Sequence, residues 1–157
     1  MTVAYTSYLK IKKHAGAHRT AHLKNFDEPI NFGIHGGIKD FYQEKYGRKL
    51  EGPEYPATLD YVVAGVAGWL TGTLAGALDA RGISATKNLV ADVQGDVEAV
   101  DGVLRITAIR IKYNFEATKD LLQKAERALQ VYADLCPAYQ SVKDAIDCSW
   151  EADIKAV

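Results

Sequence analysis

The sequence is poor in cysteine, with only Cys136 and Cys148 among 157 residues. The two form neither a C-x-x-C pair nor a zinc-binding spacing, so no disulfide framework and no structural metal site are implied. Three histidines, His14, His18 and His22, lie four residues apart and would share one face of a helix. Because glycine and strand-like patterns surround them, we expect a half-exposed hairpin without a metal.

The chain also lacks an excess of charge, with 19 basic and 20 acidic residues. No global charge therefore attracts nucleic acid or an anionic membrane, and neither is an expected partner. An apolar signal-peptide run, a lipidation motif, internal repeats and a long linker are absent too. We expect a cytoplasmic protein with one domain over residues 1–157, large enough to bury about 70% of its unfolded surface.

What the sequence does have is a long apolar stretch from Tyr55 to Gly82, which predicts one long helix. Asp60, Asp79 and the glycines within it favour a buried core helix over a membrane span. Each interior glycine costs a helix up to about 1 kcal/mol relative to alanine. A row of them therefore predicts that another backbone packs closely: Gly65, Gly68, Gly72 and Gly76.

Before this helix, the strand-like run Val3–Ile11 and a second strand over 18–23 predict a hairpin. Residues 25–37 read as a loop or short irregular strands. A short amphipathic helix follows, whose aromatic face either packs on the domain or walls an apolar pocket. The aromatic residues of that face are Phe41, Tyr42 and Tyr46.

After the central helix, Asp101-Gly102 predicts a tight hairpin between strands over 88–99 and 103–113. The apolar phase of the second strand changes near Thr107, which indicates a bulge or a change of buried face. Thr118 is a predicted cap for a helix that ends before Pro137, where a short helix begins. A strand around 148–154 closes the chain.

Three segments of this pattern resemble the OsmC/Ohr family of osmotically induced proteins and organic hydroperoxide reductases. They are the entry Gly52–Pro56, the helix Leu59–Ile83 and the sequence LCPAY at Leu135–Tyr139. The resemblance implies an α+β fold in which antiparallel sheets wrap around long central helices in an intertwined homodimer. The glycine row fits such helix packing.

The resemblance also implies an active site at the subunit interface. A peroxidatic cysteine in the central helix attacks an organic hydroperoxide, and a resolving cysteine before a proline closes a disulfide. An arginine and a glutamate hold the thiolate and orient the peroxide. No cofactor or metal is expected.

This sequence departs from the family at the key position, because Trp69 in Gly68-Trp69-Leu70 stands where the peroxidatic cysteine belongs. Indole cannot form a sulfenic acid, so the two-cysteine cycle cannot run in that form. Cys136 matches the resolving cysteine, Arg19 is a match for the arginine, and Leu59 or Asp60 falls at the glutamate. Along an unbroken helix, Asp60 and Trp69 lie on roughly opposite faces.

Three hypotheses for the altered site stay open. Cys136, at the start of the Pro137 helix, acts as a redox nucleophile or is a buried, inert thiol. Alternatively, Trp69 either fills the old cavity or lines an apolar pocket for an aromatic or acyl ligand, with Asp60, Arg19 or a histidine for acid–base work. The pocket walls would then be Tyr139, Phe41, Tyr42 and Tyr46. The third hypothesis is a structural or regulatory dimer without catalysis.

Overall fold

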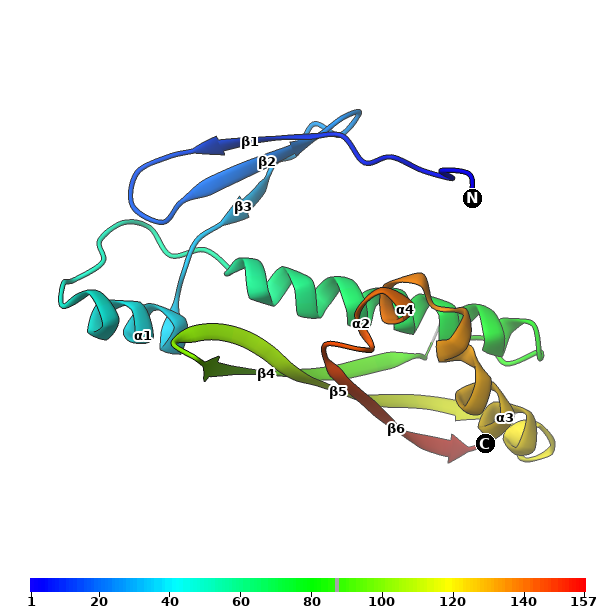
Figure 1. Ribbon diagram of the computed structural model, residues 1–157. Coiled ribbons are helices and arrows are strands. Elements are labelled where there is room, and N and C mark those ends of the chain that lie inside the picture. Colours follow the sequence, from blue (N-terminus) through cyan, green and yellow to red (C-terminus); the bar gives the residue numbers. More distant parts are fainter. Residues whose placement is uncertain (87) are drawn as a thin grey trace. The chain divides into compact units, whose positions relative to one another are not determined.

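The structure is a computed structural model that describes residues 1–86 and 88–157. Its residues form two compact units, Met1–Tyr61 and Val62–Val157. The boundary lies inside helix α2, Thr58–Asp79, whose first turn therefore belongs to the first unit. The elements mix helices with sheets, which confirms the α+β class (Figure 1). A single domain over the whole chain stays a prediction.

The first unit contains a three-stranded antiparallel sheet in the order β1-β2-β3. Its strands are β1 Leu9–Lys13, β2 Arg19–Leu23 and β3 Ile30–Phe32. The opening hairpin is confirmed, although its first strand begins six residues later than the apolar pattern suggested. Helix α1, Gly36–Tyr46, follows β3 and ends at Gly47 in the left-handed conformation (φ 60°).

The second unit contains the sheet β4-β5-β6, with helices along one face of it (Figure 1). Strands β4, Val90–Val100, and β5, Val103–Ala117, form the predicted hairpin. Asp101 and Gly102 both have positive φ, 51° and 75°, as a tight primed turn requires. Thr107 is the residue skipped by the pairing, because Val97 pairs with Ile106 and Asp96 with Ala108. The predicted bulge is confirmed at that residue.

Strand β6, Asp147–Ala156, lies on the other edge of β5 and runs parallel to it. This pair differs from the antiparallel sheets that the resemblance implied. Parallel neighbours need a crossover of a dozen or more residues, and here helical segments supply it. In chain order they are η1 Lys119–Leu121, α3 Leu122–Val131, η2 Tyr132–Leu135 and α4 Pro137–Val142. Thr118 precedes η1 but makes no side-chain capping bond.

Helix α2 provides much of the core of the second unit. Leu70, Leu74 and Leu78 are fully buried, as are Ile109 and Tyr113 of β5. By length and hydropathy α2 is also a candidate membrane span, a test that core helices of water-soluble proteins pass as well. The three buried leucines identify it as a core helix.

The closest glycine contact in the second unit is at Gly95 of β4, opposite Val63 of α2. A Cβ added to Gly95 would lie 2.6 Å from Val63 Cγ2. We expect Gly95→Ala to destabilise the protein by about 1–3 kcal/mol through overpacking. Urea unfolding measures this, and Val63→Ala in the same chain should restore part of the loss. If the two substitutions simply add, the contact does not limit packing here.

Candidate functional site

The exposed face of α2 is lined by glycine. A Cβ added to any of its four glycines, Gly65, Gly68, Gly72 and Gly76, would meet nothing within 4 Å. Within the described chain, no backbone therefore packs on the glycine row. At 100° per residue, these glycines share one face of the helix, opposite the buried leucines. We call this surface, together with Val62 and Trp69, the glycine face.

Trp69 lies on the glycine face with 58% of its surface exposed. Within residues 1–86 and 88–157, no other ring contacts its indole. Tyr139, which we expected beside it, instead packs edge to face on Trp150, with ring centroids 5.5 Å apart. In a single chain the indole therefore does not fill a cavity.

Cys136 is fully buried at the start of α4, where it precedes Pro137 in the first helical position. A reactive thiol must be reachable by its electrophile, so this burial fits an inert cysteine better than a nucleophile. Cys148 on β6 is half-buried, and burial, followed by the neighbouring Asp147 and Cys136, raises the pKa of its thiol. Both cysteines are free.

An aromatic group lies near Cys136 that the sequence did not reveal. The hydroxyl of Tyr132 donates to that of Tyr113 at 3.2 Å, and both side chains are fully buried. The Tyr132 ring also packs edge to face on Trp150, at 5.4 Å between centroids. Burial is the main cause that raises the pKa of each tyrosine, so both hydroxyls stay protonated.

In the first unit, the side chain of Asp60 caps the N-terminal end of α2. Its Oδ2 accepts the backbone N–H of Ala57 at 2.6 Å and contacts His35 Nε2 at 2.7 Å. A carboxylate in the third helical position that bonds back to the capping residue is half of a capping box. Asp60 thus has a structural role, and α2 is unbroken, as the opposite-face argument required. No motif or spacing in the sequence indicated a role for His35.

Arg19, in β2, points its Nη2 at Thr58 Oγ1, 3.5 Å away at the first residue of α2. Arg19, His35 and Asp60 thus all contact the start of this helix within the first unit. The matched arginine and carboxylate therefore lie near the same helix end, and their part in a reactive site stays a prediction. They form a polar, half-exposed group.

The aromatic face of α1 exists as predicted. Phe41 and Tyr42 pack edge to face at 5.2 Å, and Tyr42 stacks on Tyr46 at 5.7 Å. No residue of α1 is buried, and Tyr46 is 56% exposed. These rings belong to the first unit, whereas Trp69 belongs to the second.

The histidines are not arranged as metal ligands. His14 stacks on His18 at 4.5 Å, and His18 stacks on Tyr55 at 4.4 Å. Their Nε2 atoms are hydrogen-bonded to Thr20 and Asn31, both at 2.9 Å. Partial burial, then the neighbouring His18, lowers the pKa of His14. Among the described residues, no three acidic, histidine or cysteine side chains could share a metal ion.

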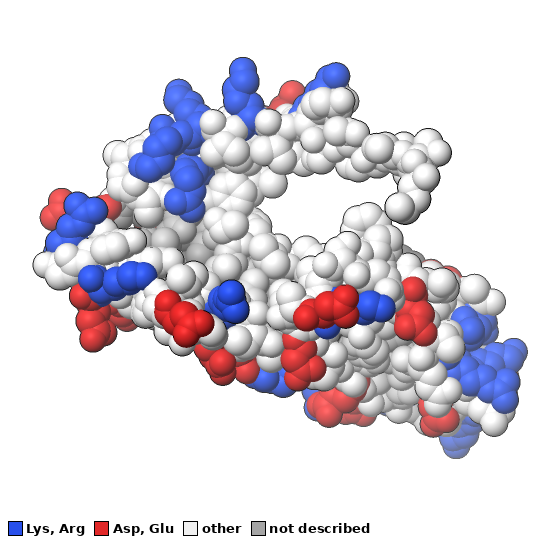
Figure 2. Space-filling model, in the orientation of Figure 1, with Lys and Arg blue, Asp and Glu red and all other residues white. Residues whose placement is uncertain are grey.

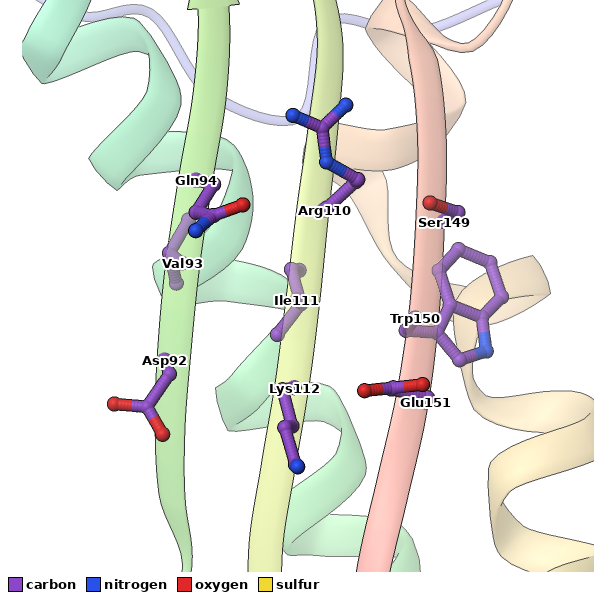
Figure 3. A pocket seen from close by; sticks show the side chains of 9 residues that line it. All are labelled: Asp92, Val93, Gln94, Arg110, Ile111, Lys112, Ser149, Trp150 and Glu151. Atoms are coloured by element: carbon purple, nitrogen blue, oxygen red, sulfur yellow. The ribbon is translucent and has the colours of Figure 1, made fainter.

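The face of the β4-β5-β6 sheet away from the helices carries an open hollow of about 680 Å³ (Figure 3). Its polar lining comes from alternate positions of the three strands, as on any solvated sheet face. Arg110 there binds Asp96 through two hydrogen bonds of 2.6 Å, which lower the pKa of that carboxyl. We therefore interpret this hollow as a solvated surface. It contains none of the predicted site residues.

Comparisons with known proteins agree with this architecture. The family model described as OsmC-like protein matches residues 51–151. The chain is similar to an OsmC-like protein from Mycoplasma pneumoniae (TM-score 0.73, 13% identity, 98% of this chain and 99% of that one). It is also similar to an organic hydroperoxide resistance protein OsmC from Legionella pneumophila (0.66, 13%, 99% and 100%).

A third similar structure is the organic hydroperoxide resistance protein OhrB of Bacillus subtilis (TM-score 0.59, 17% identity, 96% of this chain and 100% of that one). At such identities the structures establish the fold alone. No curated protein gives a significant match. The family model covers more than half of the chain and its segments include α2 and the Cys136-Pro137 step. The chain therefore belongs to the OsmC-like protein family.

Proposed function

We propose that this protein is a homodimer that binds apolar small molecules, organic hydroperoxides among them, beside Trp69, and does not reduce them by a two-cysteine cycle. The observation that carries the proposal is the exposure of Trp69 on the glycine face of α2. An exposed indole on an apolar helix face is a common element of binding surfaces.

A second copy of the chain is the occupant that the glycine face fits best. Small residues let two helix backbones approach closely, and among the residues that the structure describes no other backbone approaches this row. Isologous contacts of this kind, in which the same face meets itself, are the commonest in dimers. Two copies would also bring two Trp69 rings to one interface. The hydroperoxide names of the structural neighbours support hydroperoxides as one ligand class.

Two features argue against the family's redox cycle. Trp69 stands at the position that matches the peroxidatic cysteine, and indole has no thiolate chemistry. The remaining matched thiol, Cys136, has no exposed surface. Asp60 is engaged by the helix start and by His35, which favours a structural role for that carboxylate.

The test uses Trp150→Phe, which leaves Trp69 as the only indole of the chain. We expect cumene hydroperoxide and its alcohol to change Trp69 fluorescence saturably and with similar affinity, because binding needs no reaction. Neither wild type nor Cys136→Ser should consume the hydroperoxide in the presence of a dithiol.

Each other outcome has a definite meaning. Consumption that Cys136→Ser abolishes would contradict the loss of thiol chemistry and identify Cys136 as a nucleophile. Unchanged fluorescence without consumption would contradict the ligand proposal and leave a structural dimer. A matched control is Tyr139→Phe in the Trp150→Phe chain, which should leave the Trp69 signal unaffected because Tyr139 packs elsewhere.

A further inference from the structure

Charge is strongly segregated along this chain, although its net charge is only −1. Residues 1–26 contain five Lys or Arg, three His and no Asp or Glu. The other 131 residues contain 14 basic and 20 acidic side chains. Figure 2 shows Lys and Arg side chains gathered over the β1–β2 part of the first unit. The hairpin is therefore a basic surface on an otherwise acidic chain.

Strand pairing places three of the five Lys and Arg on one face of the hairpin, and Lys13 and Arg19 on the other. Lys10 pairs with His22 and Lys12 with Thr20, so their side chains project to the same side. Lys24 extends the row, since its N–H donates to the carbonyl of Tyr8 at 2.9 Å. The three lysines are exposed. We call this side of β1 and β2 the basic face.

Aromatic side chains accompany the cations. Tyr8 is 64% exposed, and the Nζ of Lys24 lies 5.5 Å from its ring centre. The stacked His14 and His18 continue the same face at its other end, because they are bonded to Thr20 and Asn31 there. Cations in a row with an exposed ring are the components of surfaces that bind single-stranded nucleic acid.

Three observations favour single-stranded nucleic acid over an anionic membrane or a duplex as the partner of the basic face. An anionic membrane would bind apolar side chains together with the lysines, but Lys10 and Lys12 have no apolar neighbours on their own face of β1, because Leu9 and Ile11 project from the opposite face together with Lys13. Lys10 and Lys12 are spaced by about 7 Å along the strand, a distance that an extended polynucleotide backbone can match. The exposed Tyr8 ring can stack on a base that is not paired.

We propose that the basic face of the β1–β2 hairpin binds single-stranded nucleic acid without sequence preference. Lys10, Lys12 and Lys24 contact phosphates, and Tyr8 stacks on a base. This inference does not depend on the ligand proposed for Trp69, because all of its residues lie in the first unit.

The experiment measures the anisotropy of a labelled single-stranded oligothymidylate with the full-length protein over a range of salt concentrations. With three phosphate contacts, the logarithm of the binding constant should fall against the logarithm of salt with a slope of about −2. Lys10→Gln with Lys12→Gln should weaken binding at least about tenfold and reduce the slope by about 1.4. Tyr8→Ala should weaken binding about fivefold or more.

The matched control is Lys124→Gln with Lys143→Gln, which removes two exposed charges from the second unit and should leave binding unchanged. Thermal unfolding checks that every variant folds. Absence of binding, equal binding by the two double variants, tighter binding to a duplex, or binding to phosphatidylglycerol vesicles in preference to the oligonucleotide would each overturn the proposal.

Discussion

Replacing Gly72 by leucine is expected to convert the proposed dimer into a folded monomer. Gly72 lies at the centre of the glycine face, and an added Cβ meets no atom within 4 Å in the described part of its own chain. The monomer should gain up to about 1 kcal/mol of helix stability from the loss of an interior glycine. In a dimer, the leucine would hold two helix backbones apart, and the dimer dissociation constant should rise about a hundredfold or more.

Sedimentation velocity over a range of protein concentrations measures this change. Gln123→Leu is the matched control, because it adds the same side chain at an exposed position of α3. A Gly72→Leu protein that remains a dimer would show that copies meet through another surface. A wild-type protein that is monomeric at all concentrations would contradict the dimer itself.

The buried tyrosine pair is expected to make the protein sensitive to alkali. Tyr113 and Tyr132 have raised pKa values when folded, whereas an unfolded tyrosine titrates near about 10. Above that pH the unfolded chain loses protons that the folded chain retains. Their contribution is therefore fully present below pH of about 10 and is lost as the pH rises toward the folded values. Between a pH of about 10 and the folded pKa values, each tyrosine should reduce the free energy of unfolding by about 1.4 kcal/mol per pH unit.

Urea unfolding at a series of alkaline pH values measures this slope, and tyrosinate absorbance reports the titration directly. Tyr132→Phe should remove about half of the slope, at a cost of about 1 kcal/mol at neutral pH from the lost hydrogen bond. Tyr5→Phe is the matched control, since that ring is 81% exposed and should not affect the slope. Equal slopes in all three proteins would show that the pair does not control alkaline stability.

Local chemistry explains which parts of the fold the sequence predicted. The Asp101-Gly102 turn and the bulge at Thr107 were predictable because positive φ and a change of apolar phase leave direct marks in the residues. The parallel orientation of β6 relative to β5 was not predictable from the sequence. Its alternating pattern indicates two faces, but alternation is the same for parallel and antiparallel neighbours.

The candidate site was less predictable for a related reason. Helical spacing correctly put the four glycines on one face of α2, but spacing cannot say what covers that face. Helical spacing also could not show how Asp60 is bonded. Its contact with Ala57 is local, but its contact with His35 joins residues that are 25 positions apart in the sequence. Net charge likewise concealed the basic hairpin, since a sum over the chain says nothing about where charges lie.

The parallel strand β6 also affects how the chain is made. It covers an edge of β5 but is separated from it by 29 residues, 118–146. Translation up to the end of β6 takes 39 further residues, 118–156, so at ~5–20 residues per second the β5 edge would wait on the order of 2–8 s for its neighbour. An uncovered strand edge can pair with other nascent chains. Ribosomal pausing within the crossover would lengthen that interval, so expression yield should depend on codon speed there.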